Sequence, residues 1–259
     1  MPDCLHVHIP YRQLDELLPM AIERSLQPEI GFKGPDLDQL DPELVDRAAA
    51  SLAEAGLAVT VHAPFFDLNP GALEPYVSEA TTIRFRQAMA ASSRLGARLV
   101  VFHPGYEYWK YGGMDHLWLE ASQQFWPPLI ELAEDYEIVM ALENIFETRP
   151  DTLRDLLDSI DSPWLGHCFD IGHWRLFAEA SLPEWFRALG HRIVHLHLHD
   201  NTGKGDDHRP IGEGDIDFAE LFRLTGSLPS APTMTLEAHT VEELERSLAS
   251  IQRYFHSNI

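Results

Sequence analysis

Histidine, aspartate and glutamate recur along this chain at the ends of short apolar runs. Six such runs read VTVHAP, VVFHPG, VMALEN, HCFDIGH, VHLHLHDN and MTLEAH. Together with the stretch GDDHRPIGEGD after the fifth run, they supply His62, His103, Glu143, Asp170, His173, His197, Asp206, His208 and Glu237. Imidazole nitrogens mixed with carboxylate oxygens suit Zn²⁺, Mn²⁺, Fe²⁺ or Co²⁺ better than Ca²⁺. The pattern therefore predicts divalent-metal chemistry, with zinc or manganese as the ion.

Each of these residues also has an ordinary structural interpretation. A single histidine could be a core residue with satisfied hydrogen bonds, and Asp170 could cap the helix that DIGH opens. The whole set is harder to explain in this way, because carboxylates are rarely buried unless they are paired or bind metal. Within VHLHLHDN, the residues His195, His197 and His199 share one face of a strand. Of these, His197 or His199 lies at the right height for a metal at the strand end.

Short β-type runs alternate with longer helical patterns throughout the sequence. The predicted strands are residues 4–9, 28–32, 58–62, 98–103, 137–143, 165–170, 193–200 and 233–237. The predicted helices are residues 11–25, 42–55, 73–95, 115–136, 150–159, 180–189, 218–224 and 241–255. Eight alternating units predict a single (β/α)8 TIM barrel over residues 1–259, whose strands all end at one mouth, where the active site lies. An open doubly wound sheet is the alternative, but the first strand lacks its Gly-rich turn.

The amino-acid composition limits the kinds of partner that the protein is expected to bind. The 259 residues include 19 Lys and Arg, 41 Asp and Glu and 14 His, which gives a formal charge of −22. This charge argues against a nucleic acid partner without excluding one, because bound cations can reverse the local field. There is no 18-residue apolar run and no basic, apolar leader, so we expect no membrane span and a cytoplasmic location. The two cysteines form no disulfide framework, and self-association into a homo-oligomer stays open.

Several motifs resemble those of the xylose-isomerase-like TIM-barrel superfamily. They read VHAPFFDLN, FHPG, ALENI, FDIGHW, HLHDNTGKGDDHRPIGEGDIDF and LEAH, and they extend from about residue 61 to residue 237. This superfamily joins sugar isomerases and epimerases to the type IV apurinic endonucleases, also called AP endonuclease family 2. The most specific part is HxHDN followed by DxHxPxGxGxxD, and the first two βα units agree more loosely. The resemblance implies the same barrel.

The resemblance also implies a ligand set. The endonuclease branch would hold three zinc ions, and the chain has a candidate for each of the nine ligands. The first ion would take His62, His103 and a bridging Glu143. The second would share Glu143 and add Asp170, His197 and Glu237, and the third would take His173, Asp206 and His208. The single-metal epimerases use only the counterparts of Glu143, Asp170, His197 and Glu237, so one to three ions are expected.

The first candidate chemistry is isomerisation or epimerisation of a sugar, sugar phosphate or related polyol. One divalent metal would act as a Lewis acid and stabilise an enediolate as a proton leaves carbon. Glu143 and Glu237 would face each other across the substrate and exchange roles as base and acid. The predicted substrate contacts are His6 at the rim, with His8 as its alternative, Phe65 against a sugar face and Arg209 on a hydroxyl or phosphate oxygen.

The second candidate chemistry is phosphodiester hydrolysis by a zinc cluster, which the ligands beyond the epimerase set favour. Two observations oppose it. Glu29 in PEIGFKG resembles the isomerase branch, and the sequence lacks Arg- and Lys-rich loops that would follow a DNA backbone. We therefore favour a small-molecule isomerase or epimerase. A non-catalytic binding protein on the same scaffold is a third hypothesis, which the intact polar mouth disfavours.

Overall fold

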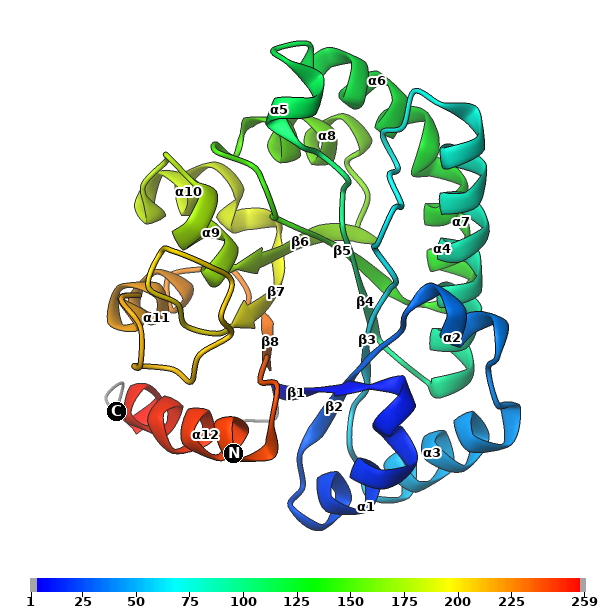
Figure 1. Ribbon diagram of the computed structural model, residues 1–259, viewed down its shortest axis with the longest axis vertical. Helices are drawn as coiled ribbons and strands as arrows, with labels where there is room; N and C mark the ends of the chain where they lie inside the picture. The colour runs from blue at the N-terminus through cyan, green and yellow to red at the C-terminus, as the bar shows by residue number, and fades with distance from the viewer. Residues whose placement is uncertain (1–3, 257–259) are drawn as a thin grey trace.

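The computed structural model describes residues 4–256, which form a closed barrel of eight parallel strands surrounded by helices (Figure 1). The strands are β1 Leu5–Pro10, β2 Gln27–Gly31, β3 Thr60–His62, β4 Leu99–Phe102, β5 Val139–Glu143, β6 Leu165–Asp170, β7 Ile193–Leu198 and β8 Thr233–Leu236. They pair in chain order, and β8 pairs with β1 to close the sheet. The predicted (β/α)8 TIM barrel is confirmed, and so are all eight predicted strands.

On the side of β4, β5 and β6, the barrel interior changes from apolar to polar along the strands. Alternate residues of a strand point to the same face. Before these strands end, their inward side chains form a small apolar cluster of Leu99, Val101, Ala141 and Cys168. The same alternation continues to the strand ends with His103, Glu143 and Asp170. These three strands therefore place ligand-type side chains one step beyond an apolar cluster, at the mouth of the barrel.

Helices cover the outside of the barrel. The longer ones are α1 Leu14–Glu23, α3 Pro42–Glu54, α4 Pro75–Leu95, α6 Asp115–Phe125, α7 Pro127–Tyr136, α8 Asp151–Ile160, α10 Leu182–Leu189, α11 Phe218–Thr225 and α12 Val241–His256. Fully buried aromatic residues such as Trp118, Trp126 and Trp185 contribute to the core that includes the helix–barrel contacts. Within residues 4–256, none of the helices combines the length and the apolar character that crossing a bilayer requires.

The helices differ from the prediction in two respects. The prediction of one helix over residues 115–136 is wrong, because Pro127 begins a new helix and has no N–H to continue the preceding one. The eight predicted helices also leave out three short ones, α2 Gly34–Asp38, α5 Tyr108–Tyr111 and α9 Ile171–Phe177, which follow β2, β4 and β6; of these, the capping interpretation of Asp170 anticipates α9. Helix α9 forms directly at the strand end because Asp170 caps it, its Oδ1 accepting from the backbone N–H of His173 at 2.6 Å.

Candidate metal centre

Glu143 lies at the centre of a group of histidines at the carboxyl end of β5. Its Oε2 is 3.2 Å from His62 Nε2 and 3.2 Å from His103 Nε2. Its Oε1 is 3.2 Å from His173 Nδ1 and 3.2 Å from His197 Nδ1. Glu143 is 1% exposed. Four imidazoles from four different βα units therefore surround one buried carboxylate.

His197 and His199 connect Glu143 to two further carboxylates. His197 Nδ1 lies 3.5 Å from Glu237 Oε1 and 3.8 Å from Asp170 Oδ2. His199 Nε2 lies 3.3 Å from Asp170 Oδ2 and 3.8 Å from Glu237 Oε2. The close approach of His199 requires a glycine at position 172, where a Cβ would lie 2.0 Å from the His199 ring. Both histidines that the sequence offered as alternatives thus reach the same carboxylates.

A third group comes from the loop between β7 and α11, drawn in gold in Figure 1. Asp206 Oδ2 is 3.3 Å from His173 Nε2 and 3.3 Å from His208 Nε2. The His208 ring stacks on His199, with the ring centroids 3.9 Å apart. The structure therefore brings all nine predicted ligands into one continuous cluster, and it adds His199 to them.

The charges of the cluster shift the pKa values of its members. Burial alone would raise the pKa of Glu143, but the surrounding histidines, His197 foremost, hold it well below its usual range. Burial alone would lower the pKa of His173, but Asp170, Asp206 and Glu143 raise it well above its usual range. Against the same effect of burial, Asp206 and Glu237 raise the pKa of His208 to about 9. Histidine protons and a divalent cation are alternative ways to neutralise these carboxylates.

The donor atoms of the cluster fit a divalent metal. The buried polar atoms of the cluster that have no hydrogen-bond partner among the described residues include Asp170 Oδ2, His199 Nε2, His208 Nδ1 and Glu237 Oε2. Such atoms are costly to bury unpaired, and these face one another at 3.3 to 3.8 Å. Three-residue groups such as His62, Glu143 and His197 offer ligand atoms within 4.8 Å of one another. A mixed nitrogen and oxygen donor set suits zinc or manganese.

Asp200 anchors the loop that carries Asp206 and His208. Its Oδ2 accepts from the backbone N–H groups of Gly212 and Gly214, both at 2.9 Å. Its Oδ1 accepts from the backbone N–H of Asn201 at 2.8 Å, and its side chain is fully buried. One carboxylate therefore ties both ends of the loop together beside the cluster.

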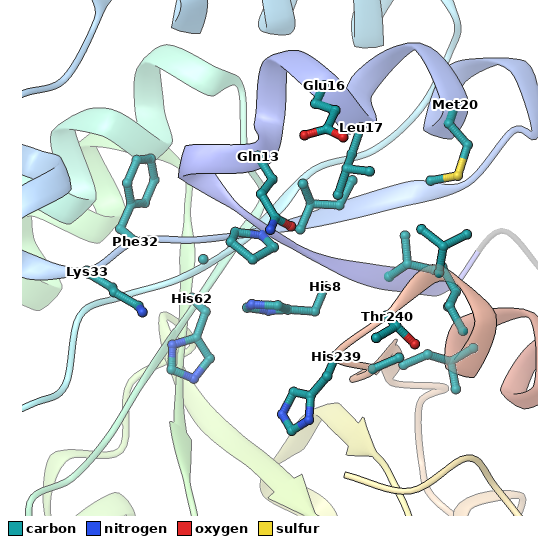
Figure 2. A pocket seen from close by; sticks show the side chains of 18 of the residues that line it. His8, Gln13, Glu16, Leu17, Met20, Phe32, Lys33, His62, His239 and Thr240 are labelled. Carbon is teal, nitrogen blue, oxygen red and sulfur yellow. The ribbon is translucent and has the colours of Figure 1, made fainter.

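A cavity of about 510 Å³ lies between β1, α1 and the start of α12, and it adjoins the cluster through His62, the one of the nine predicted ligands in its lining. Figure 2 shows the rings of His8, His62 and His239 around it, with Lys33 entering from the segment after β2. Gln13 and Glu16 of α1 add polar groups, and the apolar part of the wall includes Leu17, Met20, Phe65, Val241 and Leu244. This volume is in the range of small-molecule sites, roughly 300–1,000 Å³.

The predicted substrate contacts occupy different places. Phe65 lines the cavity and stacks on His103, with ring centroids 4.1 Å apart. His6 is 1% exposed, its Nδ1 lies 3.3 Å from the carbonyl of Pro28, and it is not among the residues that line the cavity. Arg209 lies outside the lining, on the long loop, where it pairs with Asp207 at 3.1 Å. His8, two residues beyond His6, lines the cavity instead.

Sequence reasoning missed the roles of two buried carboxylates. Asp200 was not singled out, and Glu29 was noted only as a resemblance, although both are fully buried beside the ligands. The signal for each was present, because an acidic residue within an apolar run must find partners inside the protein. Their partners come from distant strands and loops, which a linear pattern does not identify.

An eight-stranded parallel barrel with imidazoles and carboxylates gathered at its mouth defines the class of this protein, a TIM barrel with a candidate metal centre. Residues 22–254 match the family described as xylose isomerase-like TIM barrel. The chain belongs to this family, and the resemblance found in the sequence is confirmed.

Individual proteins similar to this chain extend over most of its length. The protein MJ1311 of Methanocaldococcus jannaschii is 33% identical over 205 residues, which cover 76% of this chain and 69% of MJ1311. A D-tagatose 3-epimerase-like protein of known crystal structure is 27% identical in sequence to this chain, with a TM-score of 0.82 and 97% of each chain covered. The TTHB071 protein of Thermus thermophilus, in a crystal soaked with ZnCl2, is 26% identical, with a TM-score of 0.80 and 99% of each chain covered.

Proposed function

We propose that this protein is a divalent-metal-dependent isomerase or epimerase that acts on a sugar, sugar phosphate or related polyol by proton transfer at carbon. One observation carries the proposal. The carboxylates of Glu143 and Glu237, from β5 and the end of β8, approach the same atom, His197 Nδ1, at 3.2 and 3.5 Å. Two carboxylates that converge on one point at the barrel mouth suit removal of a proton from carbon and its return. The similarity to the D-tagatose 3-epimerase-like protein supports the same chemistry.

The proposal gives each residue a role. Glu143, Asp170, His197 and Glu237 would hold the ion, which when bound supplies Lewis-acid polarisation of substrate oxygens. Glu143 stays ionised because its pKa lies well below its usual range, so it can accept a proton. Glu237 would return the proton from the other side of the substrate, and its Oε2 has no hydrogen-bond partner among the described residues. Phe65 and His8, in the cavity wall, would orient the sugar.

Deuterium exchange tests this function. The protein is incubated with Mn²⁺ or Zn²⁺ and a panel of ketoses in D₂O, and we expect deuterium to appear at a carbon next to the carbonyl group. Glu143→Ala should remove nearly all exchange, because it removes both a charge and a metal ligand. The control is Glu213→Gln, an exposed residue paired with Arg246 at 2.9 Å, which should leave exchange unchanged. Exchange with none of the ketoses, or full exchange in Glu143→Ala, would contradict the proposal.

The third ligand group favours a second candidate, a multi-zinc phosphodiesterase like the type IV apurinic endonucleases. His173, Asp206 and His208 lie together beyond the four ligands that a single-metal epimerase needs. Elemental analysis separates the candidates, because one ion per chain favours the epimerase and two or three favour the phosphodiesterase. Cleavage of an oligonucleotide with an abasic site, without deuterium exchange into ketoses, would replace the first proposal with the second.

A further inference from the structure

Glu29 is a buried carboxylate that lies directly beneath the candidate metal centre. It belongs to β2, where it pairs with His8 of β1 and Thr60 of β3 in the sheet register. Its side chain points into the barrel and is fully buried. The described residues within ion-pair distance of it are histidines, with no lysine or arginine among them. A charge in such a place persists only where hydrogen-bond donors surround it.

The two oxygens of Glu29 have different surroundings. Oε2 accepts from Thr235 Oγ1 at 2.8 Å and Thr60 Oγ1 at 3.3 Å, and it lies 3.1 Å from His195 Nε2. Oε1 lies 3.2 Å from His197 Nε2 and 3.9 Å from His8 Nδ1. Neither Oε1 nor His197 Nε2 has a hydrogen-bond partner among the described residues. Glu29 Oε1 and His197 Nε2 are therefore two polar atoms without partners that lie 3.2 Å apart.

The His197 ring connects Glu29 to the cluster through its two nitrogens. Nε2 lies 3.2 Å from Glu29 Oε1, while Nδ1 is hydrogen-bonded to Glu143 Oε1 at 3.2 Å and lies 3.5 Å from Glu237 Oε1. An imidazole that donates from one nitrogen presents the lone pair of the other, and a carboxylate partner fixes both this tautomer and the ring orientation. A ring held in this way offers Nδ1, and not Nε2, to an ion in the cluster.

We propose that Glu29 is a positioning residue that holds His197 as an Nε2–H tautomer, so that Nδ1 binds the divalent metal. The proposal rests on the proposed metal-dependent function. Glu29 itself contacts neither the substrate nor the ion; it acts through His197. Removing such a carboxylate in other metalloproteins weakens metal binding by roughly 10–100-fold.

The first experiment measures the affinity of the full chain for Zn²⁺ by competition with a chromogenic chelator. Glu29→Ala should weaken Zn²⁺ binding by roughly 10–100-fold without changing the number of ions bound. Glu29→Gln should recover most of the affinity, because its amide oxygen can still accept from His197 Nε2. The matched control is Thr235→Val, which removes the 2.8 Å donor to Oε2, the Glu29 oxygen that does not contact His197. It should perturb folding stability but leave Zn²⁺ affinity nearly unchanged.

The second experiment observes the tautomer directly. In a ¹⁵N-labelled histidine spectrum of the zinc-loaded protein, the ring signals that disappear in His197→Gln identify His197. We expect a protonated Nε2 and a zinc-bound Nδ1 in the wild type and in Glu29→Gln, and loss of this pattern in Glu29→Ala. A role for Glu29 in packing alone would change the thermal stability but not the tautomer.

Three results would reject the inference or its premise, and they differ from one another. Wild-type Zn²⁺ affinity and tautomer in Glu29→Ala would show that Glu29 does not position His197. Loss of one equivalent of Zn²⁺ with unchanged affinity for the rest would make Glu29 a ligand, since Glu29, His195 and His197 could themselves hold an ion. No binding of Zn²⁺ by the wild type would reject the metal-dependent function on which the inference rests.

Discussion

Asp170 shows how one residue of this protein meets a structural and a chemical requirement together. Its Oδ1 caps α9, and its Oδ2 faces His199 at 3.3 Å with no hydrogen-bond partner among the described residues. The sequence presented the cap and the metal ligand as competing interpretations. The structure makes them compatible, because a carboxylate has two oxygens and the helix begins where the strand ends.

Because the two oxygens of Asp170 have separate roles, the substitution Asp170→Asn should affect folding stability and metal binding differently. Asparagine caps helices about as well as aspartate, so folding stability should change by less than about 1 kcal/mol. Zn²⁺ affinity should fall by more than the roughly 10–100-fold typical of residues that only support ligands. Both quantities are measured on the same sample, by thermal unfolding and chelator competition. The control is Asp217→Asn, at the cap of α11, and a similar loss of affinity there would remove Asp170 from the ligand set.

At the scale of elements, the loop between β7 and α11 is the least regular part of the site. Hydrogen bonds to Asp200 hold its backbone in place. Position 214 must be glycine for this, because a Cβ there would lie 2.2 Å from Asp200 Oδ1. His208 has a φ of 47°, a left-handed conformation that is uncommon for a residue other than glycine. The loop therefore holds His208 in an unfavourable backbone conformation while it places the ring on His199.

Asp200→Ala should release this loop. The backbone donors of Gly212 and Gly214 would lose a charged acceptor, which costs at least roughly 3 kcal/mol of folding stability. Trypsin should cut faster after the exposed Lys204, and binding of any ion held by Asp206 and His208 should weaken most. Asp207→Asn, which changes an exposed carboxylate on the same loop, serves as the control and should alter neither. Unchanged proteolysis in Asp200→Ala would mean that other contacts hold the loop.

At the scale of the whole molecule, the chain concentrates part of its large negative charge at one place. The net charge is −22, and the buried carboxylates of Glu29, Glu143 and Asp170 lie within one network of histidines. Net charge far from zero destabilises a compact state through self-repulsion. A divalent ion that binds only the folded chain would relieve this repulsion and stabilise the fold by mass action.

Metal should therefore raise the melting temperature, and more so at higher pH. At an ion concentration of 100 times Kd, the gain is about 2.7 kcal/mol, or roughly 5–10 °C for a chain of this size. The pKa values of His173 and His208 are raised, the latter to about 9, so both rings hold protons at neutral pH that the ion must displace. The shift produced by Mn²⁺, measured by calorimetry, should therefore grow from pH 6 to pH 8. A shift that is equal in Glu143→Gln would place the ion elsewhere.

The helices show where sequence patterns stop being sufficient. The periodicity that predicts one helix over residues 115–136 is compatible with both α6 and α7, and the break comes from Pro127. The short helix α9 depends on the cap that Asp170 provides. Local patterns recognise long elements well, while short helices in loops depend on contacts that form only in the folded chain.

The alternation of apolar strands and helices was enough to determine the barrel and the mouth at which its ligand-type residues gather, because both follow from local periodicity and from where each strand ends. Only the tertiary structure decided that His199 joins His197, that Asp200 ties the long loop, that His8 rather than His6 lines the cavity, and that Glu29 lies beneath His197. Those relations depend on the register and closure of eight strands, which set the distances between side chains far apart in the chain. No linear spacing contains that information.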